Sequence, residues 1–213
     1  MSAILVKPAA RSISARPLLM AGAVAGPLFM AVVLAQAYTR SGFDPALHPL
    51  SSLALGDFGW LQVANFVVCG ALAVAGAFGL RAALAPGRAS RWGPWLIGLG
   101  GAGLIVAGIF PTDPVNGYPA GVPDTVTWHG FVHSMGPGVA GLAGLAAFVV
   151  FARRFAADRE RGWLVWSIVA PIAILVTDVI AFAAADFRAL LTGQLIGTLW
   201  ATSIYLKLRR TTG

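Results

Sequence analysis

Six long apolar blocks dominate this sequence, and most of its charged residues fall between them. A helix needs about 20 apolar residues to cross the hydrocarbon core of a bilayer. Charged residues make up only 11% of the chain, whereas soluble domains carry about 25%. The sequence therefore predicts an all-α, polytopic transmembrane bundle with one integral membrane domain over residues 1–213. The expected spans are about residues 17–38, 60–84, 92–110, 128–151, 162–184 and 189–206.

The lysines and arginines between these blocks are divided unevenly. If the N-terminus lies in the cytoplasm, thirteen of them fall in cytoplasmic segments, and only Arg40 and Arg188 fall outside. Because cytoplasmic loops are enriched in basic residues, this asymmetry predicts that both termini are cytoplasmic. The net charge of +7 then reflects topology. We expect no nucleic-acid binding, since the sequence has neither zinc-finger spacing nor a basic surface interleaved with aromatic residues.

The first apolar block has a second interpretation. It follows basic residues and ends near Ala35-Gln36-Ala37, which fits the small-residue pattern of a signal-peptide cleavage site. Its apolar stretch is longer than the usual 7–15 residues of a signal peptide. We therefore expect it to be retained as a transmembrane helix, and the sequence leaves cleavage open as the alternative.

Polar residues gather toward the predicted outer side. His129 and His133 are four residues apart at the start of the fourth block, so on a helix they share one face. Asp178, Asn65 and Gln194 fall at similar depths in other blocks. An ionisable group at such depth usually faces the bundle interior. The pattern predicts a polar His/Asp pocket that opens toward the outer side.

Metal binding is one chemistry that this pocket would support. The pair His129 and His133, with Asp113 or Asp178, resembles a zinc ligand set that leaves a position open for water. Asp113 and Asp124 are the nearest candidates to orient the histidines. Two alternatives remain at this point. His133 and Asp178 could relay protons, as in a proton-coupled transporter, or the polar groups could form a non-catalytic network that holds the helices together.

The segment from His48 to Asp57 supplies the remaining candidates. Ser51 or Ser52 would offer a hydroxyl to the pocket, but we favour the interpretation that either serine caps a helix. The favoured specific hypothesis is a metal-assisted enzyme that acts on a lipid or isoprenoid-like amphiphile. In that hypothesis Asp57, Ser51 and Asp178 assist catalysis. The competing hypothesis is a non-enzymatic lipid-binding or structural membrane protein.

Several short segments also carry a resemblance to a known family. They are His48-Pro49-Leu50-Ser51-Ser52-Leu53, Gly59-Trp60-Leu61-Gln62 with Asn65-Phe66, Gly108-Ile109-Phe110-Pro111-Thr112-Asp113-Pro114, and Trp128-His129-Gly130-Phe131-Val132-His133. In their order and spacing they resemble the family called domain of unknown function 998, roughly from the first helix to the last. The resemblance implies a multi-pass protein of a bacterial or archaeal cytoplasmic membrane, and it implies no reaction.

A pattern-level similarity concerns the helix ends alone. A serine, an aspartate and a His-x-x-x-His pair at helix ends are similar to the arrangement in zinc-dependent membrane hydrolases that include the alkaline ceramidases. Those proteins have seven helices and a further histidine. This chain has six expected spans, and only His48 would match that histidine.

Overall fold

The structure is a computed structural model that describes residues 14–212. Within this range it is all-helical, and six helices are each long and apolar enough to cross a membrane, which confirms the expected transmembrane bundle. Lys7 and Arg11, two of the basic residues assigned to the cytoplasm, lie outside the described residues. The long helices are α1 (Ala15–Thr39), α2 (Gly59–Leu84), α3 (Trp92–Ile109), α4 (Trp128–Ala157), α5 (Arg161–Ala184) and α6 (Arg188–Thr211), and a short 3₁₀ helix, η1, spans Leu50–Ala54.

The helix starts agree closely with the apolar blocks, whereas two helix ends extend further. α4 continues to Ala157 and α6 to Thr211, each several residues past its block. Both extensions carry arginines, such as Arg153 and Arg154 on α4. Arginine is a good helix former, so a charged side chain ends the membrane span without ending the helix.

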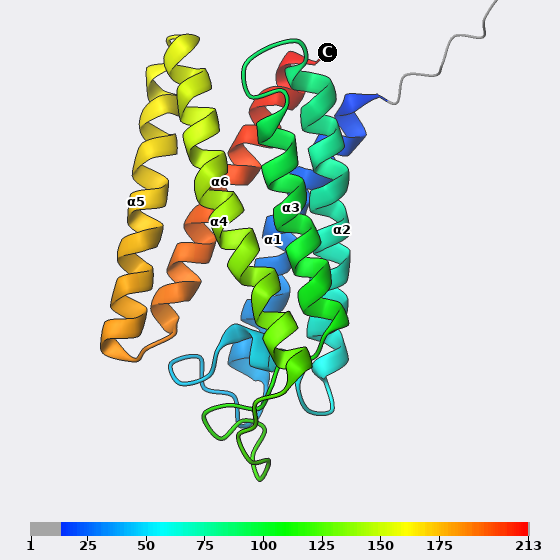
Figure 1. Cartoon of the computed structure of the whole chain (residues 1–213), viewed down its shortest axis with the longest axis vertical. Coiled ribbons are helices and arrows are strands. Elements are labelled where there is room, and N and C mark those ends of the chain that lie inside the picture. Colours follow the sequence, from blue (N-terminus) through cyan, green and yellow to red (C-terminus); the bar gives the residue numbers. More distant parts are fainter. Residues whose placement is uncertain (1–13, 213) are drawn as a thin grey trace, which may run out of the picture.

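The helices form a ring in chain order. Each packs against its neighbours in sequence, and α6 closes the ring against α1. Figure 1 shows that the loop between α1 and α2 and the loop between α3 and α4 lie together at one end, with the α5–α6 turn at the same end. We call this the histidine end, because His48, His129 and His133 lie there. The opposite end, which carries the α4–α5 turn and the C-terminus, we call the basic end.

The core is divided between these two ends. Toward the basic end, Phe151 and Phe155 of α4 pack with Trp200 and Tyr205 of α6. Toward the histidine end, the core combines helix residues with loop residues that include Phe43, Leu53 and Tyr118. The loops of the histidine end are therefore part of the packed structure and cover the ends of α1 and α2.

The outward faces of the helices are apolar. On α5 the exposed side chains include Ile172, Val176, Val179 and Phe182, and the last of these is 72% exposed. A soluble monomer rarely exposes a continuous apolar surface of this kind. The bundle therefore fits a lipid bilayer environment, and the chain is a multi-pass membrane protein.

The short helix η1 corrects one expectation about the serines. Its first turn is preceded by Pro49, and no side chain caps it. Neither Ser51 nor Ser52 caps α2 either, since the residue before that helix is Phe58. Capping by a serine is therefore wrong. η1 instead packs on α1 and α2, with Leu53 fully buried.

Candidate functional site

His133 lies inside the bundle at the histidine end. Its side chain is 2% exposed, and its Nδ1 lies 2.9 Å from the carbonyl oxygen of Phe110, the residue that follows α3. Its ring meets the ring of Phe66 on α2 edge to face, with 5.8 Å between centroids. His133 therefore points into the bundle, and the partner of its Nδ1 is a backbone carbonyl.

His129 lies one turn nearer the end of α4, in a network around Thr127. The Thr127 hydroxyl donates to Asp113 Oδ1 at 2.6 Å and accepts from the amide of Gly130 at 3.1 Å, so it caps the helix. The Thr127 amide donates to Asp113 Oδ2 at 2.8 Å. His129 Nδ1 lies 2.9 Å from the same hydroxyl and 3.1 Å from the carbonyl oxygen of Pro111.

These contacts assign the protons of all three histidines. A carbonyl oxygen only accepts hydrogen bonds, so Nδ1 of His133 and Nδ1 of His129 each carry the proton that they donate. In the neutral ring, Nε2 is then a free acceptor. In His48 the order is reversed, because its Nδ1 accepts the amide proton of Asp44 at 2.8 Å. Its neutral ring therefore carries the proton on Nε2.

Asp113 functions as a structural anion at the start of α4. Its carboxylate packs so closely on Gly130 that a Cβ there would overlap it. Burial alone would raise the pKa of this carboxyl, but the two hydrogen bonds from Thr127 and the nearby imidazoles of His129 and His133 lower it, and the net pKa lies below its ordinary value. An anion at a helix N-terminus is favoured by the helix dipole.

A second polar chain runs from α1 into α2. Arg40 donates from Nη2 to Gln36 Oε1 at 2.6 Å, and Gln36 Nε2 donates to Gln62 Oε1 at 2.9 Å. Asn65 donates to the carbonyl oxygen of Phe29 at 3.1 Å. Arg40 also donates to the carbonyl oxygens of Leu53, Leu55 and Phe58, at 2.5, 3.2 and 2.7 Å. One cation thus holds the loop of η1 onto the end of α1.

Three buried polar atoms at this end have no hydrogen-bond partner among the described residues. They are Nε2 of His133, Nε2 of Gln62 and the hydroxyl of Ser52. Gln62 and Ser52 are fully buried. Buried polar atoms are almost always paired, and each exception needs an explanation. Together they offer an acceptor on His133, a donor on Gln62 and a hydroxyl on Ser52 that does either.

The other sequence candidates are more scattered. Asp57 is exposed in the loop before α2, and Ser51 is half-buried on η1. Asp178 is half-buried at the contact between α5 and α6, where a Cβ on Gly193 would lie 3.5 Å from its Oδ1. Gln194 is exposed on the outer surface of α6. The expectation that Gln194 faces a common cavity is wrong, because the register of α6 turns Gly193 inward instead.

The possible metal ligands do not converge in the part of the chain that the structure describes. Across residues 14–212, no three side chains of the His, Cys, Asp and Glu types come close enough to hold a metal ion. Asp113 Oδ1 lies 3.9 Å from Nδ1 of His129, the nitrogen that already donates to a carbonyl. Two surface hollows lie elsewhere, one at the basic end and one on the lipid-facing side of α5.

Sequence reasoning missed Arg40, Gln36 and Gln62. Arg40 counted only as an exception to the charge asymmetry, although it is the cation that organises the histidine end. Gln36 and Gln62 are polar residues within apolar blocks, and this position alone could have marked them as residues that face the bundle interior. Their pairing joins α1 to α2 across 26 positions, so no local pattern reveals it.

Comparison with known proteins gives one match. The family model described as "Protein of unknown function (DUF998)" matches residues 23–207, which is most of the chain. No curated protein and no solved structure matches.

Proposed function

Because the chain belongs to the DUF998 family, whose description assigns no activity, we propose from its geometry that it binds the hydroxyl-bearing headgroup of an amphiphile at the histidine end. The observation that carries this proposal is the set of unpaired buried atoms on His133, Gln62 and Ser52. A hydroxyl group both donates and accepts. In this proposal it donates to Nε2 of His133 and accepts from Nε2 of Gln62.

The surroundings of these atoms favour a ligand that arrives from the bilayer. Phe131 and Met135 lie on either side of His133 in α4. Both are apolar, and their exposed fractions are 66% and 51%. On the aqueous side the loops cover the site, with Tyr118 and Leu53 buried. An amphiphile would therefore reach His133 more readily than a water-soluble solute would. The proposed location is the cytoplasmic membrane of a bacterium or archaeon.

The test compares two amphiphiles that differ in their hydroxyl groups. Purified protein in detergent is heated with monoolein or with methyl oleate, which has the same acyl chain without free hydroxyls. A ligand that binds only the folded protein raises the melting temperature, because it stabilises by about 2.7 kcal/mol at a hundred times its Kd. We expect monoolein to raise the melting temperature and methyl oleate to leave it unchanged.

His133→Phe should abolish the difference between the two amphiphiles. The matched control is Ser134→Ala, on the neighbouring exposed position, where the hydroxyl bonds only to the carbonyl oxygen of Gly130. Equal shifts with both amphiphiles, or a full monoolein shift in the His133→Phe protein, would refute the proposal.

A second candidate is the metal-assisted enzyme. It is favoured by one observation: both histidines of the His-x-x-x-His pair donate Nδ1–H to a carbonyl at the end of α3. Histidines that bind a metal usually donate the other ring nitrogen in this way. Zinc would then take Nε2 of His129 and His133 with Asp113, and Asp57, Ser51 or Asp178 would assist the reaction.

Metal analysis separates the two candidates. Protein purified with zinc present is dialysed and its zinc content is measured, together with the His129→Phe and His133→Phe variants. One zinc per chain that is lost in both variants would support the enzyme. Zinc below a tenth of the protein concentration in the unmodified chain would count against it, while the hydroxyl-dependent thermal shift would remain.

A further inference from the structure

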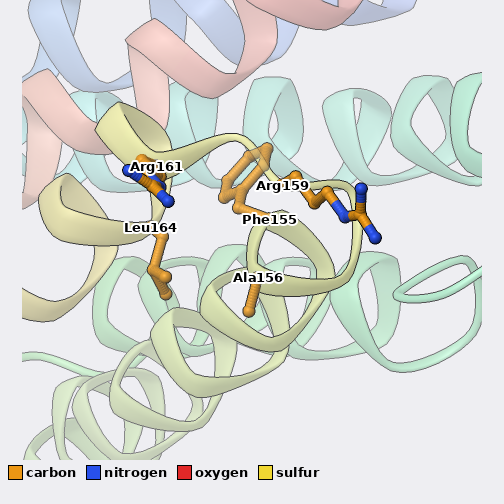
Figure 2. A pocket seen from close by; sticks show the side chains of 5 residues that line it. All are labelled: Phe155, Ala156, Arg159, Arg161 and Leu164. Atoms are coloured by element: carbon orange, nitrogen blue, oxygen red, sulfur yellow. The ribbon is translucent and has the colours of Figure 1, made fainter.

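A hollow at the basic end lies at the turn between α4 and α5. Its volume is about 320 Å³. Figure 2 shows the side chains that line it, with Arg159 and Arg161 on either side of Phe155. The floor is apolar, since Ala156 and Leu164 complete the lining. The lining therefore combines three apolar residues with two arginines, and in Figure 2 the guanidinium group of Arg159 extends outward from the hollow.

The carboxylates of this turn are already paired with other cations. Asp158 Oδ2 lies 3.4 Å from Nε of Arg154, and Glu160 Oε2 lies 2.7 Å from Nζ of Lys207. Neither Arg159 nor Arg161 forms an ion pair or a side-chain hydrogen bond with any residue that the structure describes. Two positive charges thus border the hollow without an anion to balance them.

The backbone of the turn adds a second point. Arg159 has a φ of +58°, in the left-handed region where glycine is the usual residue after a helix. The turn is closed by the amide of Glu160, which donates to the carbonyl oxygen of Phe155 at 2.9 Å. An arginine therefore occupies a position where glycine would be less strained.

We propose that this hollow binds the phosphodiester group of an anionic phospholipid. Guanidinium groups match phosphate oxygens with paired hydrogen bonds. The site lies at the end of membrane-spanning helices, at the level of lipid headgroups, and Trp163 beside it is of the type that occupies this interface. The apolar floor fits the glycerol and first acyl carbons, which a free phosphate ion lacks. Basic recesses between transmembrane helices are a known mode of headgroup recognition.

The test measures lipid binding to the full chain in detergent. Protein is titrated with dioleoylphosphatidylglycerol, with dioleoylphosphatidylcholine and with inorganic phosphate, and bound lipid is counted by native mass spectrometry. We expect tighter binding of phosphatidylglycerol than of phosphatidylcholine. Inorganic phosphate at millimolar concentration should not displace it.

Paired variants locate the site. The double change Arg159→Gly and Arg161→Gln should weaken phosphatidylglycerol binding about tenfold or more, because each basic residue near the headgroups contributes about 1 kcal/mol. Arg159→Gly relieves the positive φ, so a loss of binding cannot be blamed on misfolding of the turn. The control is Arg209→Gln with Arg210→Gln, which removes the same charge from exposed residues of the same end and should change binding less than about threefold.

Three results would overturn the proposal. Equal binding of the two lipids would show that the negative charge of the phosphatidylglycerol headgroup is not recognised. Equal weakening by both double variants would show that net charge acts without a specific site. Displacement of the lipid by inorganic phosphate would make a soluble anion the ligand.

Discussion

Gly103 of α3 and Gly136 of α4 meet backbone to backbone. A Cβ built on either glycine would overlap the carbonyl oxygen of the other. The two helices therefore approach as closely as their backbones allow, about one turn beyond His133 along α4 and near the end of α3 that provides its carbonyl partner. This contact sets the distance across which His133 reaches Phe110.

Gly136→Ala should lower the free energy of unfolding by about 1–3 kcal/mol, the usual cost of overpacking a tight contact. The control is Gly138→Ala, where a Cβ would meet nothing within 4 Å. That change should be neutral or stabilising by up to about 1 kcal/mol, because alanine favours the helix. Thermal unfolding in detergent measures both, and similar melting temperatures for the two variants would contradict the close contact.

Arg40→Met should destabilise the histidine end. The change removes charge-assisted hydrogen bonds to Gln36 and to three loop carbonyls, and we expect a loss of about 2 kcal/mol or more. Amide hydrogen exchange over residues 50–59 should accelerate before the rest of the protein unfolds. Arg188→Gln, which breaks only a surface pair with Asp186, serves as control. Unchanged exchange in the Arg40→Met protein would contradict the role of this cation.

The pKa of Asp113 predicts a dependence of stability on acid. Its folded-state pKa lies below the ordinary value of 3.8. The carboxylate therefore contributes stability that is fully present above that ordinary value and is lost as pH falls through the lower folded-state pKa. Melting temperatures measured from pH 6 downward should fall more for the native chain than for Asp113→Asn, which starts lower. Parallel curves for the two proteins would show that Asp113 is not the group responsible.

Asp178→Leu tests whether this carboxylate has a partner. Asp178 is half-buried in a membrane-spanning helix and forms no hydrogen bond with the described residues. Ionisable groups within a membrane are costly, so the change should raise stability by about 1 kcal/mol. Val179→Leu, at a lipid-exposed position, should have almost no effect. A loss of stability in the Asp178→Leu protein would instead indicate that Asp178 belongs to a polar network, and a loss of ligand binding would support a role in the pocket.

Reporter fusions test the proposed orientation. Thirteen of the fifteen basic residues lie in segments on one side of the predicted topology, so we expect fusions after Leu84 and after Phe155 to report the cytoplasm. A fusion near Tyr118 should report the outer side. A cytoplasmic signal at Tyr118 would reverse the topology and place the histidine end inside.

Sequence alone determined the six helices and where each begins, because a bilayer demands long apolar segments and makes charges within them rare. It also indicated that His133 faces the bundle, since an ionisable group within a span usually does. What it left undecided was how side chains on different helices would pair. Gln36 with Gln62 and Arg40 with the η1 loop depend on rotation and register about each helix axis, and many apolar surfaces allow several registers in lipid.

Only the tertiary structure decided those registers, through close contacts such as that of Gly103 with Gly136. In the folded chain Gln194 faces outward and Gly193 faces inward, and Ser52 is buried rather than Ser51. Asp113 binds Thr127, the residue that caps α4. It also left Arg159 and Arg161 unpaired beside an apolar hollow, because the nearby carboxylates reach other cations first. Composition specifies how much polarity a membrane helix carries, but packing specifies which groups it meets.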